Sequence, residues 1–88
     1  MGHTTPLIRT VTTPAYGRVV IEASDGNRYS ADLSSFRAVS CYPPDAEAWS
    51  HVSIDGYGLA LVWACRFEVH AEQVVGLADK VERVDAAA

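Results

Sequence analysis

Positions 16–33 constrain the fold most, because they predict two strands joined by a tight turn. Apolar and polar side chains alternate along both arms, on either side of a turn at Ser24-Asp25-Gly26. A two-residue turn would mix apolar and polar side chains on each face of the hairpin. A three-residue turn with Gly26 in the left-handed conformation places Ile21 opposite Tyr29 and separates the two kinds of side chain. The sequence therefore predicts a three-residue turn and a hairpin with one apolar face.

A second hairpin is predicted from two further apolar segments, residues 51–55 and 59–63, with residues 55–58 as the loop. Pairing Ile54 with Leu59 keeps the apolar side chains together, and two glycines allow positive φ angles in the loop. The 59–63 strand is apolar on both faces. It is therefore predicted to be an interior strand, covered by a helix or by a second copy of the protein.

The remaining elements predicted are shorter: a strand at 7–12, a helical turn capped by Asp32, a helix from Pro44 through Trp49, and a C-terminal helix at 71–81. The last prediction rests on apolar residues spaced three and four apart, namely Val74, Leu77, Ala78 and Val81. Together these elements predict a single small α+β domain over residues 7–81. Its antiparallel sheet is made of two hairpins and an N-terminal strand, with residues 1–6 and 82–88 as flexible termini.

Length and charge limit the classes of function. A chain of 88 residues has room for one core only, so a homodimer would add to its thin margin of stability. The net charge is −4, and Lys80 is the single lysine, which argues against direct binding to nucleic acid. An acidic domain can still contact a basic partner protein, although mild acidity is also ordinary for soluble proteins.

No catalytic or metal site is expected. Cys41, His51, Cys65 and His70 are too widely spaced to resemble a zinc motif, and a nucleophile set of Cys41, His51 and Asp55 lacks a local signature. The sequence shows neither a secretory segment nor an apolar run long enough to cross a membrane, so we expect a cytoplasmic protein with reduced thiols. A disulfide between Cys41 and Cys65 is the alternative. We expect no cofactor and no enzymatic activity.

Several short motifs occur in an order that resembles a bacterial family. They are an Ile-x-x-Val strand at Ile8, the turn at Ser24-Asp25-Gly26, Asp32-Leu33, a short helix bearing Trp49, a glycine-containing turn, and Trp63. Over about Leu7 to Leu77 this order resembles the bacterial domain of unknown function family numbered 2442.

The resemblance implies a small α+β domain with no established activity and no catalytic residue to carry over. Stand-alone members of that family are encoded beside another small protein, which has prompted toxin–antitoxin proposals. Family members usually start the helix after the Trp with a Ser-Pro-like pair, whereas this chain has His70 and Ala71 there. The first turn of that helix is therefore expected to be poorly capped.

Two functions follow as hypotheses. The first is a non-enzymatic protein-interaction module, homodimeric and paired with a small protein encoded nearby. The second is a small-molecule-binding domain in which Tyr29, Trp49 and Trp63 line a cavity. The candidate interface or pocket residues are Tyr29, Trp49, Tyr57, Leu59, Leu61 and Trp63.

Overall fold

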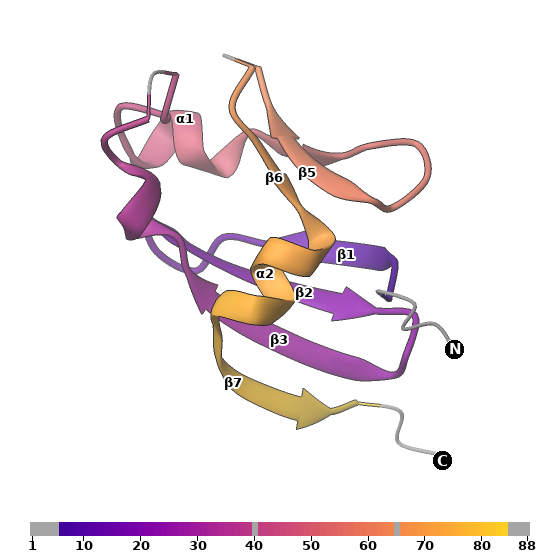
Figure 1. Ribbon diagram of the computed structural model, residues 1–88. Coiled ribbons are helices and arrows are strands. Elements are labelled where there is room, and N and C mark those ends of the chain that lie inside the picture. Colours follow the sequence, from indigo (N-terminus) through magenta and orange to yellow (C-terminus); the bar gives the residue numbers. More distant parts are fainter. Residues whose placement is uncertain (1–5, 40, 65, 85–88) are drawn as a thin grey trace.

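The computed structural model describes residues 6–39, 41–64 and 66–84, which form two antiparallel sheets and short helices (Figure 1). The first sheet has the strand order β1-β2-β3-β7 and the second has the order β4-β5-β6. The strands are β1 (Ile8–Thr12), β2 (Arg18–Ala23), β3 (Asn27–Asp32), β4 (Val52–Ile54), β5 (Ala60–Trp63), β6 (Glu68–His70) and β7 (Ala78–Arg83). The helices are α1 (Ala46–Ser50), α2 (Ala71–Leu77) and a 3₁₀ turn at Ser34–Phe36. The predicted α+β class is confirmed, with the two hairpins in two separate sheets where the sequence predicted one.

The hairpin of β2 and β3 has the register that the sequence predicts. Ile21 lies opposite Tyr29 and Val19 lies opposite Ala31. Gly26 has a φ of 84°, and its N–H donates to the carbonyl of Ala23 at 3.1 Å. The three-residue turn is therefore confirmed, and the apolar face of this hairpin is the buried face of the first sheet.

The second hairpin forms, but its predicted register is wrong by two residues. Ile54 lies opposite Leu61 instead of Leu59, because the loop is longer than predicted and β5 begins only at Ala60. A shift of two residues leaves every side chain on the same face, so apolar alternation cannot distinguish the two registers. Only one of the two loop glycines, Gly58, has a positive φ. β5 is the central strand of its sheet, and Leu59 is not part of it. Ala60, Leu61 and Trp63 are buried, whereas Val62 is only half-buried, so the predicted cover on both faces is incomplete.

The C-terminal segment differs most from the prediction. The helix ends at Leu77, and the residues after it form β7, which pairs with β3 as far as Arg83. This strand extends past position 81, the predicted end of the domain. Of the apolar residues that predicted one continuous helix, Val74 and Leu77 lie in α2, whereas Ala78 and Val81 lie in β7. Val81 lies opposite Tyr29 in the sheet. β6 was also missed, because three residues are too few to show a period.

The helix starts are capped by side chains. The Asp45 carboxylate accepts the N–H of Ala48 at 2.9 Å, so Asp45 is the N-cap of α1 and the helix begins after Pro44. Asp32 accepts the N–H of Ser34 at 2.8 Å, as predicted. The first turn of α2 is not poorly capped: the side chain of Gln73 accepts the N–H of His70 at 2.9 Å.

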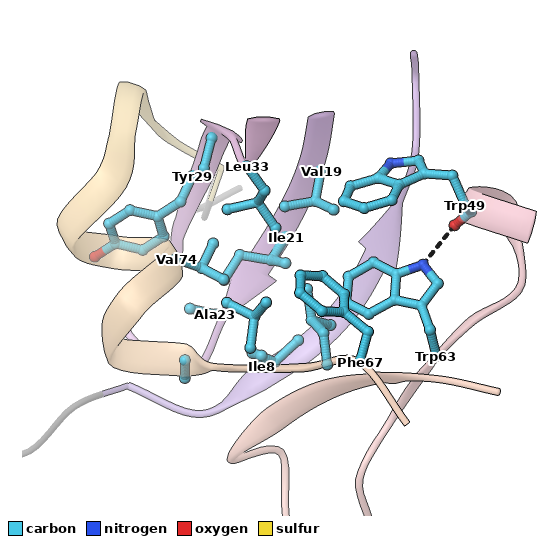
Figure 2. Close-up of a cluster of buried hydrophobic side chains, with 14 residues drawn as sticks. Ile8, Val19, Ile21, Ala23, Tyr29, Leu33, Trp49, Trp63, Phe67 and Val74 are labelled. Atoms are coloured by element: carbon cyan, nitrogen blue, oxygen red, sulfur yellow. Dashed lines mark hydrogen bonds between the residues drawn. The ribbon is translucent and has the colours of Figure 1, made fainter. Parts of the chain in front are cut away.

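The core lies between the two sheets and under α2 (Figure 2). Its largest fully buried side chains are Trp49, Trp63, Ile21, Leu33 and Leu61. The sheets meet at β1, where the N–H of Ile8 donates to the carbonyl of Gly58 at 2.7 Å. Within the described residues, no helix has the length and apolar character needed to cross a membrane.

Candidate functional site

The six candidate residues from the sequence divide into two groups. Tyr29, Trp49, Leu61 and Trp63 are buried, the two tryptophans to 1% exposure, and belong to the core. Tyr57 and Leu59 are 79% and 49% exposed. The structure therefore separates the candidates into core side chains and a surface pair on the β4–β5 loop.

The three aromatic residues predicted to line a cavity do not converge on one. The rings of Trp49 and Trp63 stack with centroids 4.7 Å apart. Tyr29 lies at the other end of the cluster, beside α2, with Ile21 and Val74 between it and the tryptophans (Figure 2). Each polar group is also satisfied by the protein: the Tyr29 hydroxyl donates to Asp25, and the Trp49 indole donates to the Arg18 carbonyl at 2.9 Å. These rings pack the core.

The surface pair belongs to a loop whose backbone is held firmly. The Asp55 carboxylate accepts the N–H groups of Tyr57 and Leu59, both at 3.1 Å. The Leu59 carbonyl accepts the N–H of Ala71 at 2.8 Å, and the Gly58 carbonyl accepts the Ile8 N–H. An ordered backbone thus presents two large apolar side chains to solvent.

A shallow concavity of about 240 Å³ lies beside this loop. It is lined by Asp55, Leu59, His70, Ala71 and Glu72. We call the concavity, together with Tyr57 and the neighbouring Leu7, the tip surface. Leu7 is 42% exposed and reaches the loop at Gly58, where a Cβ would lie 3.2 Å from the Leu7 Cβ.

The tip surface is acidic as well as apolar. Its described lining residues include two carboxylates, Asp55 and Glu72, and no lysine or arginine. The carboxylate of Glu68, at the start of β6, lies 3.7 Å from the imidazole of His70 at its end, which lines the concavity. An acidic rim beside exposed apolar side chains favours a basic, partly apolar ligand.

The other candidate chemistry is dispersed. His51 and Asp55 flank opposite ends of the three-residue strand β4, so their Cα atoms are separated by about 13 Å of extended chain. The Asp55 carboxylate is engaged by the loop backbone. Cys41 is exposed, whereas Cys65 lies outside the described residues. Among the residues that the structure describes, no three His, Cys, Asp or Glu side chains are grouped to hold a metal ion.

No pattern in the sequence indicates the concavity. His70, Ala71 and Glu72 join it because the short strand β6 pairs with β5 and delivers the start of α2 to the loop. Neither the pairing nor the bond from Ala71 to Leu59 leaves a periodic trace in the sequence. Tyr57 and Leu59 could be found from the sequence because they flank a loop glycine.

The fold and the tip surface define a small two-sheet α+β domain that displays apolar side chains on an ordered loop. No family model, no curated protein and no solved structure matches the chain. The resemblance to the family numbered 2442 therefore stays a prediction.

Proposed function

We propose that the protein is a non-enzymatic interaction module that binds a partner protein at the tip surface. The observation that carries the proposal is the exposure of Tyr57 and Leu59, at 79% and 49%, on a loop fixed by hydrogen bonds. Tyrosine is among the side chains that contribute most to binding energy in protein interfaces. An ordered loop also loses little conformational entropy on binding.

The partner is a segment that carries a lysine or arginine beside an apolar side chain. The apolar side chain would pack on Tyr57 and Leu59, and the cation would lie near Glu72, which is exposed in the first turn of α2. The overall charge of −4 favours the approach of such a partner. A small basic protein encoded nearby, as the family resemblance implies, would fit this chemistry.

Selection from a random peptide library displayed on phage, with the full chain as the target, tests the proposal. We expect enriched peptides to combine a basic and an apolar residue. Tyr57→Ala should weaken their binding at least about tenfold, because it removes the largest exposed contact. Glu72→Gln should weaken binding less and reduce its dependence on salt.

Val39→Ser is the matched control, since Val39 is 48% exposed and follows the 3₁₀ turn, away from the tip surface. This variant should bind the selected peptides as the unmodified chain does. A selection without enriched peptides, or peptides that bind the Tyr57→Ala variant equally well, contradicts the proposal.

A second candidate function is binding of a small amine in the concavity. His70 and the carboxylates of Asp55 and Glu72 line it together, which favours a cationic ligand. Its volume of about 240 Å³ lies below the range of roughly 300–1,000 Å³ that is common for ligand pockets, so we rank this function second. A thermal-shift screen of amines decides it: a rise in Tm that Glu72→Gln abolishes would favour this function over the first.

A further inference from the structure

β7 is an edge strand of the first sheet and is exposed from Asp79 to Arg83. Within the described residues it pairs only with β3, and it is the outermost strand in Figure 1. Val81 is 54% exposed although it lies opposite the buried Tyr29, on the face that elsewhere packs against the core. An edge of this kind can accept another strand.

The backbone of β7 shows which residues would pair with that strand. The N–H of Val84 donates to the carbonyl of Gly26 at 2.9 Å, so the polar groups of Val84 point toward β3. In an antiparallel sheet the direction alternates from residue to residue. The N–H and C=O of Val81 therefore point away from β3, toward the open edge.

The charges of β7 are arranged symmetrically about Val81 with opposite signs. Lys80 and Glu82 lie one residue to either side, and Asp79 and Arg83 lie two residues to either side. Lys80 and Glu82 share the solvent face of the sheet, where their side chains are 3.3 Å apart. A strand with this pattern is complementary to its own antiparallel copy.

We propose that β7 pairs with β7 of a second copy of the chain, antiparallel and with the two-fold axis at Val81. This inference names the interface of the homodimer that the interaction module was expected to form, and it does not depend on the tip surface. Each Val81 would exchange two backbone hydrogen bonds with Val81 of the second copy. Lys80 would lie opposite Glu82 of the second copy, and this pair sets the register, because Asp79 lies at the register shift between β3 and β7 and already contacts Arg18.

The same charges exclude the neighbouring registers. Moving the axis by half a residue places Asp79 opposite Glu82 or Lys80 opposite Arg83, and moving it by one residue places Lys80 or Glu82 opposite itself. Every one of these registers brings like charges together, which destabilises a strand pair. The pattern thus permits one antiparallel register and opposes unlimited edge-to-edge association.

Sedimentation velocity of the full chain, from micromolar to millimolar concentration, combined with two charge variants tests the interface. Lys80→Glu and Glu82→Lys each place like charges opposite one another in their own homodimers. Each should raise the dissociation constant of the dimer at least about tenfold. An equimolar mixture of the two variants restores opposite charges at both positions, so it should form a one-to-one heterodimer, which native mass spectrometry identifies.

A second pair of variants separates the interface from general surface effects. Val81→Glu should give a monomer, whereas Val39→Glu, at a site of similar exposure, should leave the dimer unchanged.

An unmodified chain that stays monomeric up to millimolar concentration overturns both the dimer and its interface. A dimer that withstands Val81→Glu, or charge variants that do not recover on mixing, overturns the β7 interface alone. Peptide binding at the tip surface should be unaffected by all four variants, so either proposal can fail without the other.

Discussion

The indole N–H of Trp63 donates a 2.8 Å hydrogen bond to the backbone carbonyl of Trp49, and the indole rings of the two residues are stacked on each other. The indole of Trp49 in turn donates to the carbonyl of Arg18 in β2. These two bonds connect the second sheet to α1, and α1 to the first sheet. The tryptophans thus join the halves of the domain and are not available to bind a ligand.

Trp63→Phe should lower the free energy of unfolding by about 2 kcal/mol or more. The change removes buried ring volume and leaves the Trp49 carbonyl without its donor. Urea unfolding followed by circular dichroism measures the effect. Tyr57→Phe is the control, because Tyr57 is exposed, and it should change stability by less than about 0.5 kcal/mol. Equal stability of the two variants would contradict the role of Trp63.

Removing the hydroxyl groups of Tyr16 and Tyr42 should have different effects. The Tyr16 hydroxyl donates to the Pro43 carbonyl at 2.6 Å, so Tyr16→Phe should cost about 1 kcal/mol. The buried Tyr42 hydroxyl has no hydrogen-bond partner among the described residues, and its burial raises the pKa of Tyr42. Tyr42→Phe should therefore leave stability unchanged or raise it by up to about 1 kcal/mol. Thermal unfolding of both variants provides the comparison, and a larger loss for Tyr42→Phe would argue against this packing.

Gly58→Ala should destabilise the junction between the sheets, whereas Gly56→Ala should not. Gly58 has a φ of 76°, and a Cβ there would lie 2.8 Å from the Ile8 carbonyl oxygen. No atom lies within 4 Å of the corresponding position at Gly56. We expect a loss of about 2 kcal/mol at Gly58 and less than about 0.5 kcal/mol at Gly56, measured by chemical denaturation. Similar values for both would mean that the loop is not held against β1.

The pH dependence of stability should reflect the carboxylate at the β2–β3 turn. Partial burial raises the pKa of Asp25, but hydrogen bonds from the Tyr29 hydroxyl and the Asn27 N–H outweigh it, so the pKa is lowered. A lowered pKa of Asp25 in the folded state stabilises the protein at pH values above the ordinary pKa of an aspartate. This stabilisation is lost as the pH falls through the pKa of Asp25 in the folded state.

Unfolding experiments between about pH 5 and pH 2 should therefore show stability falling with acid, with a shallower fall in Asp25→Asn. The bond to Asp25 also raises the pKa of Tyr29 above its ordinary value. The contribution of Tyr29 to the stability of the folded state is fully present at pH values below the ordinary pKa of a phenol. It is lost as the pH rises through the pKa of Tyr29 in the folded state. An Asp25→Asn profile as steep as that of the unmodified chain would contradict the acid-side assignment.

The sequence predicts well those features that depend on neighbours along the chain. The β2–β3 register follows from alternation together with a turn whose length Gly26 fixes. The β4–β5 register could not be predicted to the residue, because a slip of two positions preserves alternation. The loop length depends on the hydrogen bonds that the Asp55 carboxylate accepts from Tyr57 and Leu59.

β7 could not be predicted because its structure depends on a partner distant in sequence. Alone, residues 78–83 show no strand period, and the valine at 81 continues the spacing of α2. Ion pairs join β7 to the other strands of its sheet: Arg18 of β2 contacts Asp79 at 2.6 Å, and Arg28 of β3 contacts Glu82 at 3.4 Å. Tertiary pairing thus overrides a local helical pattern.

The candidate site was found only in part for the same reason. Tyr57 and Leu59 were predicted from their loop, whereas the core positions of Trp49 and Trp63 depend on packing between the sheets. The concavity depends on β6, which is too short to be seen in the sequence.

Chemical-shift mapping by NMR of the ¹⁵N-labelled chain, titrated with a peptide selected on it, tests the proposed function most directly. We expect the largest shifts at the amides of Tyr57, Leu59 and Glu72, while the amide signals of β7 and Val39 stay in place. Shifts concentrated on β7, or spread evenly over the domain, would contradict the tip surface as the place where the partner binds.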